Sequence, residues 1–497
     1  MIVGKRPINI FIYCIFALFI YSLFQRIPHL DDAWLGEQVY WLNKDGVVRN
    51  VLMKHYFNNH IGILGYHKLT IWIGIIFTNL FGFSLIALKS VSLVSLIIFL
   101  AAFYYYTVII NKIVSKQGFL LVAGLFVIAP HVFEFSFVYR PEIPLMAFSF
   151  ISFIFLDISR NNKRELFFVI ISAIFVGASV LIHLNGLVFI SSGIILLLYR
   201  KQYKSILIFV AVSISISMIY FVHFNSIQEV IQWGNIISGA NSTSLISSDP
   251  ISVISNLFIR LFNEHYRLFH SPKEITLTIF TILIIIFAFS QLKKQKPGLL
   301  LYLLILFLSI AIISINKSSK YSVVYYPYIV LLVIYFSKQH FSTTGSKYIL
   351  PKNKQSYIFI FFIGLFIVSS LVYDIRLSIQ KFSPIQNRNI TEKYVLPPQT
   401  DKTIVAPMHF IFNELENYKE IISLMSFNER QKTEDQLYGD GFFITANKEN
   451  IDYLIITDEY WKSLKLPDTT MSYYISNYRI IGREIGQTIL VNTKLQN

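Results

Sequence analysis

Apolar runs long enough to cross a bilayer constrain the fold of this chain more than any other feature of its sequence. A helix needs about 20 apolar residues to span roughly 30 Å of hydrocarbon. Eleven candidate runs can be read, at residues 8–24, 84–110, 118–133, 142–157, 166–183, 187–199, 205–222, 276–291, 298–315, 321–336 and 356–373. Only 14% of the residues are charged, well below the share in soluble domains. The sequence therefore predicts an all-α polytopic membrane bundle, with the number of spans open around 60–83 and 183–199.

Basic residues gather in alternate loops between these runs. With the N-terminus in the cytoplasm, the inner loops carry 17 lysines and arginines but only two acids, Asp157 and Glu165. This asymmetry follows the positive-inside rule and places the C-terminus outside. Topology and lipid contacts thus explain the net charge of +15, and we expect no nucleic-acid partner. The first run lacks a small-residue cleavage site, so we interpret it as an uncleaved signal anchor.

Two external loops and a C-terminal segment complete the predicted layout. The first loop, about 25–83, is expected to lie at the membrane interface, and the second, about 223–275, mixes turn residues with an amphipathic piece. The last 124 residues are more charged and contain short β-like runs at 403–406, 453–456, 478–481 and 488–491. We therefore expect a transmembrane domain over 1–373 and a small extracytoplasmic α/β domain over 374–497.

Two adjacent carboxylates, Asp31 and Asp32, stand where the first helix leaves the hydrocarbon. Paired charges beside a bilayer are costly, which favours a functional role. An aspartate at this place commonly caps a helix, here one beginning at Ala33. Capping accounts for one acid but not for two. The residues alone therefore leave a structural and a catalytic role equally open.

Other polar residues lie near the predicted outer ends of the spans. The further candidates for a site are Glu37, His60, Lys89, Arg140, Glu142, His183, Lys320, Tyr321 and Tyr325. Carboxylates, histidines and cations together suit a transfer reaction on a phosphate-linked lipid. The cations would hold the phosphate, and a carboxylate would deprotonate the incoming acceptor.

Several of these candidates also have a simple structural explanation. Arg140 and Glu142 flank a proline and can pair with each other at the mouth of a helix. His183 can form a hydrogen-bonded turn between two spans. Lys89 can extend its ammonium to the interface without any ligand, and Tyr325 can serve packing alone.

Five motifs, taken in order, point to a known family. Residues 28–37 hold a proline, two adjacent acids and a later glutamate; 57–62 contain a histidine but lack prolines; 80–89 hold Leu-Phe-Gly before a lysine; 139–142 read Tyr-Arg-Pro-Glu; 320–327 begin Lys-Tyr and end Tyr-Tyr-Pro. The series resembles the GT-C glycosyltransferases, specifically the dolichyl-phosphate-mannose protein mannosyltransferases and aminoarabinose transferases. The resemblance covers about residues 8–336. The missing prolines in 57–62 weaken any role for His60.

This resemblance implies an inverting transfer of a sugar from a polyprenyl-phosphate donor to an acceptor of the cell envelope, on the non-cytoplasmic face of a bacterial inner or plasma membrane. It makes Asp31 the first choice for the base that activates the acceptor. Asp32 would support it or bind a divalent cation such as Mg²⁺ or Mn²⁺. Glu142 would be a second acid. The candidates for binding the donor phosphate are Arg140, Lys89 and Lys320.

Two other classes of protein remain alternatives. A glycolipid transporter or flippase would place ionisable groups near the bilayer midplane and often show repeated halves, and neither feature is visible here. A membrane-tethered binding protein would use residues 374–497 but would leave the acids of the first loop unexplained. The sugar stays open, and the acceptor can be a glycolipid, a polysaccharide or a protein.

Overall fold

The protein divides into two compact units. The computed structural model describes residues 3–55, 62–63, 65–160, 162–239, 250–314, 317–344, 348–351, 354–380, 385–395, 398–429, 440–465, 474–484 and 486–495. Unit 1 consists of Met1–Arg26, His67–Thr70 and Val91–Gln380. Unit 2 consists of Ile27–Tyr66, Ile71–Ser90 and Lys381–Asn497.

Unit 1 is a helical bundle, and each of the eleven apolar runs of the sequence forms a helix. These helices are α1 (Lys5–Leu23), α4 (Leu85–Tyr104, which begins in unit 2), α5 (Lys116–Val127), α7 (Glu142–Ile158), α8 (Glu165–Ile182), α9 (Leu187–Tyr199), α10 (Tyr203–Ser217), α14 (Pro272–Gln295), α15 (Pro297–Ile313), α16 (Tyr326–His340) and α17 (Lys354–Ser378). A small sheet of order β1-β3-β2 joins β1 (Val3–Gly4), β2 (Phe341–Thr344) and β3 (Tyr348–Pro351). The predicted all-α membrane bundle is confirmed.

The helices differ in how far they can reach through a bilayer. Five helical segments of the described chain are long and apolar enough to cross alone, namely Leu85–Ile110, Glu165–Ile182, Tyr203–Phe221, Ser319–Lys338 and Lys354–Ser378. A pair of helices bent by 110°, Ile251–Leu268 with Pro272–Phe287, makes a sixth if it forms one span. Other apolar helices are shorter. One of them, α5, has 12 residues and rises only about 18 Å before Pro130 starts a new helix.

Short elements connect the long helices of unit 1. They are η1 (Tyr105–Ile110), α6 (Pro130–Phe135), η2 (Leu184–Gly186), η3 (Met218–Phe221), α11 (Ile227–Gly239), α12 (Pro250–Phe262), α13 (Glu264–Leu268) and η4 (Ser319–Tyr325). The amphipathic piece expected in the second external loop is helical, as α12 and α13. The turn residues expected before it lie mainly in 240–249, outside the described residues.

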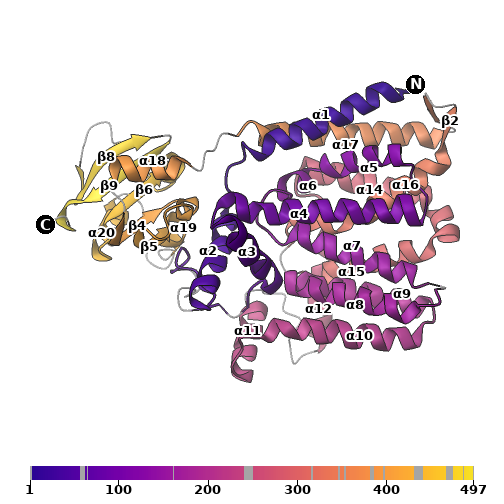
Figure 1. Ribbon diagram of the computed structural model, residues 1–497, viewed down its shortest axis with the longest axis horizontal. Helices are drawn as coiled ribbons and strands as arrows, with labels where there is room; N and C mark the ends of the chain where they lie inside the picture. Colours follow the sequence, from indigo (N-terminus) through magenta and orange to yellow (C-terminus); the bar gives the residue numbers. More distant parts are fainter. Residues whose placement is uncertain are drawn as a thin grey trace. The chain divides into compact units, whose positions relative to one another are not determined.

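Close packing of helices holds unit 1 together. Figure 1 shows α8 running beside α7 and α10, with which it makes extensive contacts. Glycines allow this approach, because a Cβ on Gly177 would lie 2.8 Å from the backbone oxygen of Ser213, and one on Gly193 would lie 2.6 Å from the Phe209 ring. Buried aromatic rings fill the interior, including a stacked pair of Phe103 and Phe150.

Unit 2 is built on a six-stranded sheet of order β5-β4-β6-β9-β8-β7. Its strands are β4 (Gln399–Ala406), β5 (Tyr418–Ser423), β6 (Tyr453–Thr457), β7 (Tyr474–Ile475), β8 (Tyr478–Glu484) and β9 (Gln487–Asn492). The pairs of β4 with β5 and with β6 are parallel, and the other pairs are antiparallel. The accompanying helices are α18 (Ile385–Tyr394), α19 (Leu424–Glu429), α20 (Asp440–Lys448) and α21 (Asp458–Ser463), followed by η6 (Thr493–Leu495). All four predicted β-like runs are strands.

The first external loop belongs to the same unit as this sheet. It contributes α2 (Leu30–Asp45) and most of α3 (Lys68–Phe81), while η5 (Met408–Ile411) packs against α2. The Ser423 hydroxyl at the end of β5 donates to the Leu52 carbonyl at 2.7 Å, and Lys54 pairs with Glu420 at 2.8 Å. The boundary expected at residue 374 stays a prediction, but the contacts join the loop to the C-terminal segment.

Candidate active site

The acid pair lies in the first turn of α2, but the cap differs from the expected one. The helix begins at Leu30, with His29 as its N-cap. The Asp32 carboxylate accepts the His29 N–H at 2.7 Å, and His29 Nδ1 accepts the Asp31 N–H at 3.1 Å. These two bonds form a capping box. The alternative in which Asp31 caps a helix starting at Ala33 is therefore wrong, because the helix starts earlier and Asp32 is the capping acid.

Asp32 has a second structural partner in Lys89. Its Oδ2 lies 3.5 Å from Lys89 Nζ, and both side chains are almost completely buried. The same oxygen accepts the His29 amide. Because an ammonium and a backbone N–H already contact this oxygen, a divalent ion cannot use Asp32 Oδ2 as a ligand without displacing Lys89. Among the described residues, no three acidic, histidine or cysteine side chains gather into a group that could hold a metal.

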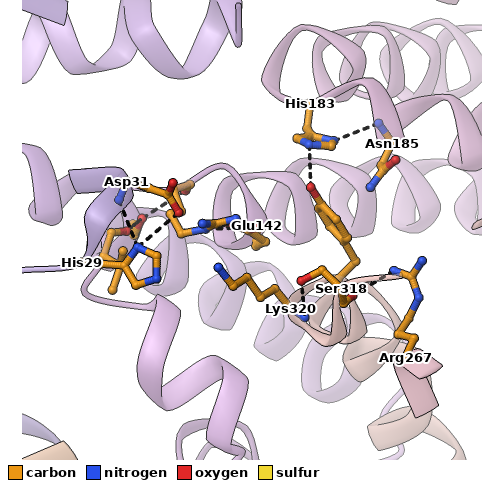
Figure 2. A network of polar contacts seen from close by, with 12 residues as sticks. His29, Asp31, Glu142, His183, Asn185, Arg267, Ser318 and Lys320 are labelled. Atoms are coloured by element: carbon orange, nitrogen blue, oxygen red, sulfur yellow. Dashed lines mark hydrogen bonds and ion pairs between the residues drawn. The ribbon is translucent and has the colours of Figure 1, made fainter. Parts of the chain in front are cut away.

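Asp31 is placed differently from its neighbour. Its Oδ2 lies 3.1 Å from His29 Nδ1, and its side chain keeps 10% of its surface exposed (Figure 2). Since Nδ1 accepts the Asp31 amide, it carries no proton in the neutral imidazole, and the contact is not an ion pair in that state. A proton taken up by the Asp31 carboxylate can therefore be shared with the ring nitrogen. This arrangement suits an acid that receives a proton.

Glu37, expected to contact substrate, is occupied by structural hydrogen bonds. Its Oε1 accepts from Trp41 Nε1 at 2.9 Å and from the Val51 N–H at 2.8 Å, and its Oε2 accepts from the Leu52 N–H at 3.1 Å. The side chain is fully buried, and burial raises its pKa to about 7, although these hydrogen bonds act in the opposite direction. Glu37 thus fastens the loop after α2, and no direct contact with a ligand follows from its geometry.

Arg140 and Glu142 form the close pair that their sequence suggested. Arg140 Nε and Nη2 both donate to the Glu142 carboxylate, at distances down to 2.6 Å, and Glu142 is fully buried. The guanidinium lies 5.6 Å from the centre of the Phe135 ring. Because the pair balances its own charge, a site for an anion needs further cations.

His183 connects a turn of the chain to Tyr321. Its Nδ1 accepts the Asn185 N–H at 3.0 Å, which confirms the hydrogen-bonded turn, and its Nε2 lies 2.9 Å from the Tyr321 hydroxyl (Figure 2). The neutral ring therefore carries its proton on Nε2 and donates it to Tyr321, which leaves the tyrosine proton for another acceptor. His67 stacks on His183 at 4.8 Å, and burial lowers the pKa of His67 to about 4.

Arg267 is a buried cation that the sequence did not single out. Its side chain is fully buried, Nε pairs with Glu264 at 2.6 Å, and Nη1 donates to the Ser318 carbonyl at 3.3 Å. Its Nη2 makes no hydrogen bond with any described residue. The guanidinium also lies 5.7 Å from the Tyr321 ring. The sequence predicts Arg267 as one charge of an amphipathic helix, and its burial follows from the packing of α13 against its neighbours, which include η4 and α14.

Of the remaining candidates, Lys320 is a charge without a partner among the described residues, and Tyr325 is a packing residue. The Lys320 ammonium makes no ion pair or hydrogen bond with the described residues and lies 6.0 Å from the Phe135 ring. Tyr325 is buried and stacks on Phe307 at 4.0 Å, as expected for a packing residue. His60 lies outside the described residues.

Solved structures with the same architecture provide a comparison. The ArnT protein of Cupriavidus metallidurans bound to undecaprenyl phosphate matches with a TM-score of 0.52 and 11% identity, over 99% of this chain and 98% of that one. The oligosaccharyltransferase of Archaeoglobus fulgidus in complex with Zn and sulfate matches with a TM-score of 0.53 and 12% identity, over 90% of this chain and 68% of that one. AglB of the same organism, with an inhibitory peptide and a dolichol-phosphate, gives 0.50 and 13%, over 92% and 70%.

Sequence comparison alone finds no relative. No family model matches the sequence, and no curated protein does either. The likeness therefore lies in the fold, which these structures share with the present chain over nearly its full length. Together with its apolar helices, it identifies this chain as an integral membrane protein with the fold of the GT-C glycosyltransferases.

Proposed function

We propose that this protein transfers a sugar from a polyprenyl-phosphate donor to an acceptor of the cell envelope. The observation that carries this proposal is the different placement of two adjacent acids. Asp32 caps α2 and pairs with Lys89, whereas Asp31 serves neither purpose and can share a proton with His29. A fold common to transferases raises the expectation but does not by itself decide the function.

Cations of unit 1 support the binding of a lipid phosphate. Arg267 offers a buried Nη2 without a hydrogen-bond partner among the described residues, and the Lys320 ammonium has no carboxylate partner there. The Tyr321 hydroxyl has a proton to donate because His183 supplies its other hydrogen bond. Buried donors without partners favour an anionic ligand. Arg140 and Glu142 belong to the same group of side chains, but their charges cancel each other.

The proposed reaction needs one base and one leaving group. The acceptor hydroxyl oxygen attacks the anomeric carbon from the side opposite the phosphate, and the bond between that carbon and the phosphate oxygen breaks. The phosphate leaves on the polyprenyl chain with the bonding electron pair, and Asp31 takes the hydroxyl proton. A phosphate ester is already a good leaving group, so the mechanism requires no acid to protonate it. Inversion at the anomeric carbon follows.

The orientation in the membrane belongs to this proposal. The lysine-rich loops on one side support a cytoplasmic N-terminus and a reaction on the opposite face. A cysteine introduced beside Lys294 would then react with a membrane-impermeant reagent only after the membrane is opened. Labelling in intact cells would contradict the orientation without touching the chemistry.

A panel of radiolabelled polyprenyl-phosphate sugars tests the function directly. The purified chain, reconstituted with envelope extracts, is expected to transfer the label from at least one donor, and Asp31→Asn is expected to abolish that transfer. A chain that transfers no sugar from any donor but carries the lipid across vesicles would instead be a glycolipid flippase. Normal transfer by Asp31→Asn would remove Asp31 from the mechanism.

A further inference from the structure

Lys320 lines a cavity of unit 1. Its volume is about 500 Å³, and it is bounded by α6, the start of α14, η4 and the end of α17. His131 and Glu274 line it and are both almost fully buried, with His131 Nε2 3.0 Å from Glu274 Oε1. His131 Nδ1 has no hydrogen-bond partner among the described residues. None of these groups has a part in the reaction proposed above.

The acids of this cavity are already compensated. Glu134 accepts a hydrogen bond from Tyr373 at 2.6 Å, and the Lys273 ammonium lies 3.8 Å from Glu134 and 3.9 Å from Glu274. Lys273 also lies 3.9 Å from the centre of the Tyr373 ring. Glu134 and Glu274 thus share Lys273, and Glu274 also contacts His131. With Lys320 and Arg376 on the same wall, the cations that line the cavity outnumber its carboxylates by three to two.

Two further cations on the wall have no such compensation. Lys320 and Arg376 both line the cavity, and neither makes an ion pair or a side-chain hydrogen bond with any described residue. Their charges are therefore available to a ligand. Serine hydroxyls at positions 271, 319 and 369 add polar groups to the same wall. This chemistry selects an anion with several oxygen atoms, such as a phosphate.

The mouth of the cavity indicates how the ligand arrives. Val372 lines it and exposes 67% of its surface, and Ile375, next to Arg376, exposes 48%. Both belong to α17, one of the helices long and apolar enough to span a membrane. Exposed apolar side chains on such a helix face lipid. A ligand can therefore enter from the bilayer with its tail outside the cavity and its charged head within.

We propose that this cavity binds the phosphate head of a membrane lipid, with Arg376 and Lys320 as its counter-ions. Lys320 also belongs to the proposed phosphate-binding group of the transferase, so the inference rests on that function for the identity of the lipid but not for binding itself. The phosphate can come from the polyprenyl-phosphate donor or from another anionic lipid of the membrane. Both sources offer the same head group to the same cations.

Binding of defined lipids to the full chain in detergent tests the proposal. Native mass spectrometry with undecaprenyl phosphate, phosphatidylglycerol and uncharged undecaprenol measures the three affinities. Arg376→Gln is expected to weaken binding of undecaprenyl phosphate about tenfold, since it removes one charge-assisted contact. The matched control is Lys354→Gln, an exposed cation at the other end of the same helix and about 33 Å away, which should change nothing.

The outcomes separate the two sources and the two proposals. An effect of Arg376→Gln on undecaprenyl phosphate alone supports the donor as occupant, and an equal effect on phosphatidylglycerol supports anionic lipids in general. Equal binding of undecaprenol and undecaprenyl phosphate, or no change in Arg376→Gln, would overturn the inference. Asp31→Asn should bind the lipids normally. Loss of lipid binding in Arg376→Gln together with absent sugar transfer by the wild type would leave this inference standing and refute the transferase.

Discussion

The two adjacent acids of α2 give the sharpest prediction, because neighbouring and chemically identical substitutions should fail in different ways. In Asp32→Asn, the amide oxygen can still accept the His29 N–H, but the buried Lys89 ammonium loses its charged partner at 3.5 Å. Removing one member of a buried ion pair costs about 3–5 kcal/mol. We expect about 3 kcal/mol, the lower end, because the cap survives.

Asp31→Asn should leave stability nearly unchanged. The Asp31 N–H, which bonds His29, belongs to the backbone and is kept, and the carboxylate makes no ion pair with the neutral His29 ring. Loss of a general base lowers the rate by about 10²- to 10⁴-fold. Thermal unfolding and sugar transfer should be measured on the same detergent-purified samples. For Asp32→Asn, the expected loss of 3 kcal/mol lowers the melting temperature by roughly 6–12 °C, given the size of unit 2.

The comparison between the two variants contains its own control. We expect Asp32→Asn to be unstable and to regain activity at low temperature, and Asp31→Asn to be stable but without activity at any temperature. The opposite pattern, with a stable, inactive Asp32→Asn and an active Asp31→Asn, would show that the structural and chemical roles have been assigned to the wrong acids.

Three further predictions follow from single contacts. Glu37→Gln should lower the stability of unit 2 by about 1–3 kcal/mol in denaturant unfolding, because an amide NH₂ must then face one of three N–H donors. Gly186→Ala should lower melting temperature and transfer, since its Cβ would lie 2.4 Å from the Ser179 backbone, whereas Gly364→Ala meets nothing within 4 Å and should be neutral. Burial lowers the pKa of His67 to about 4. As the pH falls from about 6.5 to 4, the His67 side chain therefore becomes protonated in the unfolded chain but stays neutral in the folded one. The free energy of unfolding should drop by about 3 kcal/mol over that range in the wild type and much less in His67→Gln. A variant with the same pH profile as the wild type would refute the assignment of this pH dependence to His67.

Periodicity and length were enough to predict most of the fold. Apolar runs predicted the helices because a bilayer solvent leaves few alternatives for a long uncharged segment. The sequence does not predict strand β5, because Lys419 and Glu420 interrupt its apolar pattern, and these two are the residues of the strand that the sheet does not bury. The sequence predicts one run where the structure has the two short helices α5 and α6, because Pro130, which divides them, lies among apolar residues.

Local pairs of the candidate site were predictable, but distant partners were not. Arg140 and Glu142 are two residues apart, and His183 and Asn185 form one turn, so their contacts follow from spacing. The burial of Arg267 depends on a helix meeting a segment about 50 residues later. The cap of α2 was misassigned because His29, an uncommon N-cap, begins the helix one turn earlier than expected.

A donor carrying two labels tests the central claim most directly. With ³²P in the polyprenyl phosphate and ¹⁴C in the sugar, the reconstituted chain should separate the labels, leaving ³²P on the lipid and ¹⁴C on an envelope acceptor in inverted anomeric configuration. The separation should cease in Asp31→Asn. Labels that stay together on one lipid while it crosses the membrane would contradict the transferase and establish a transporter in its place.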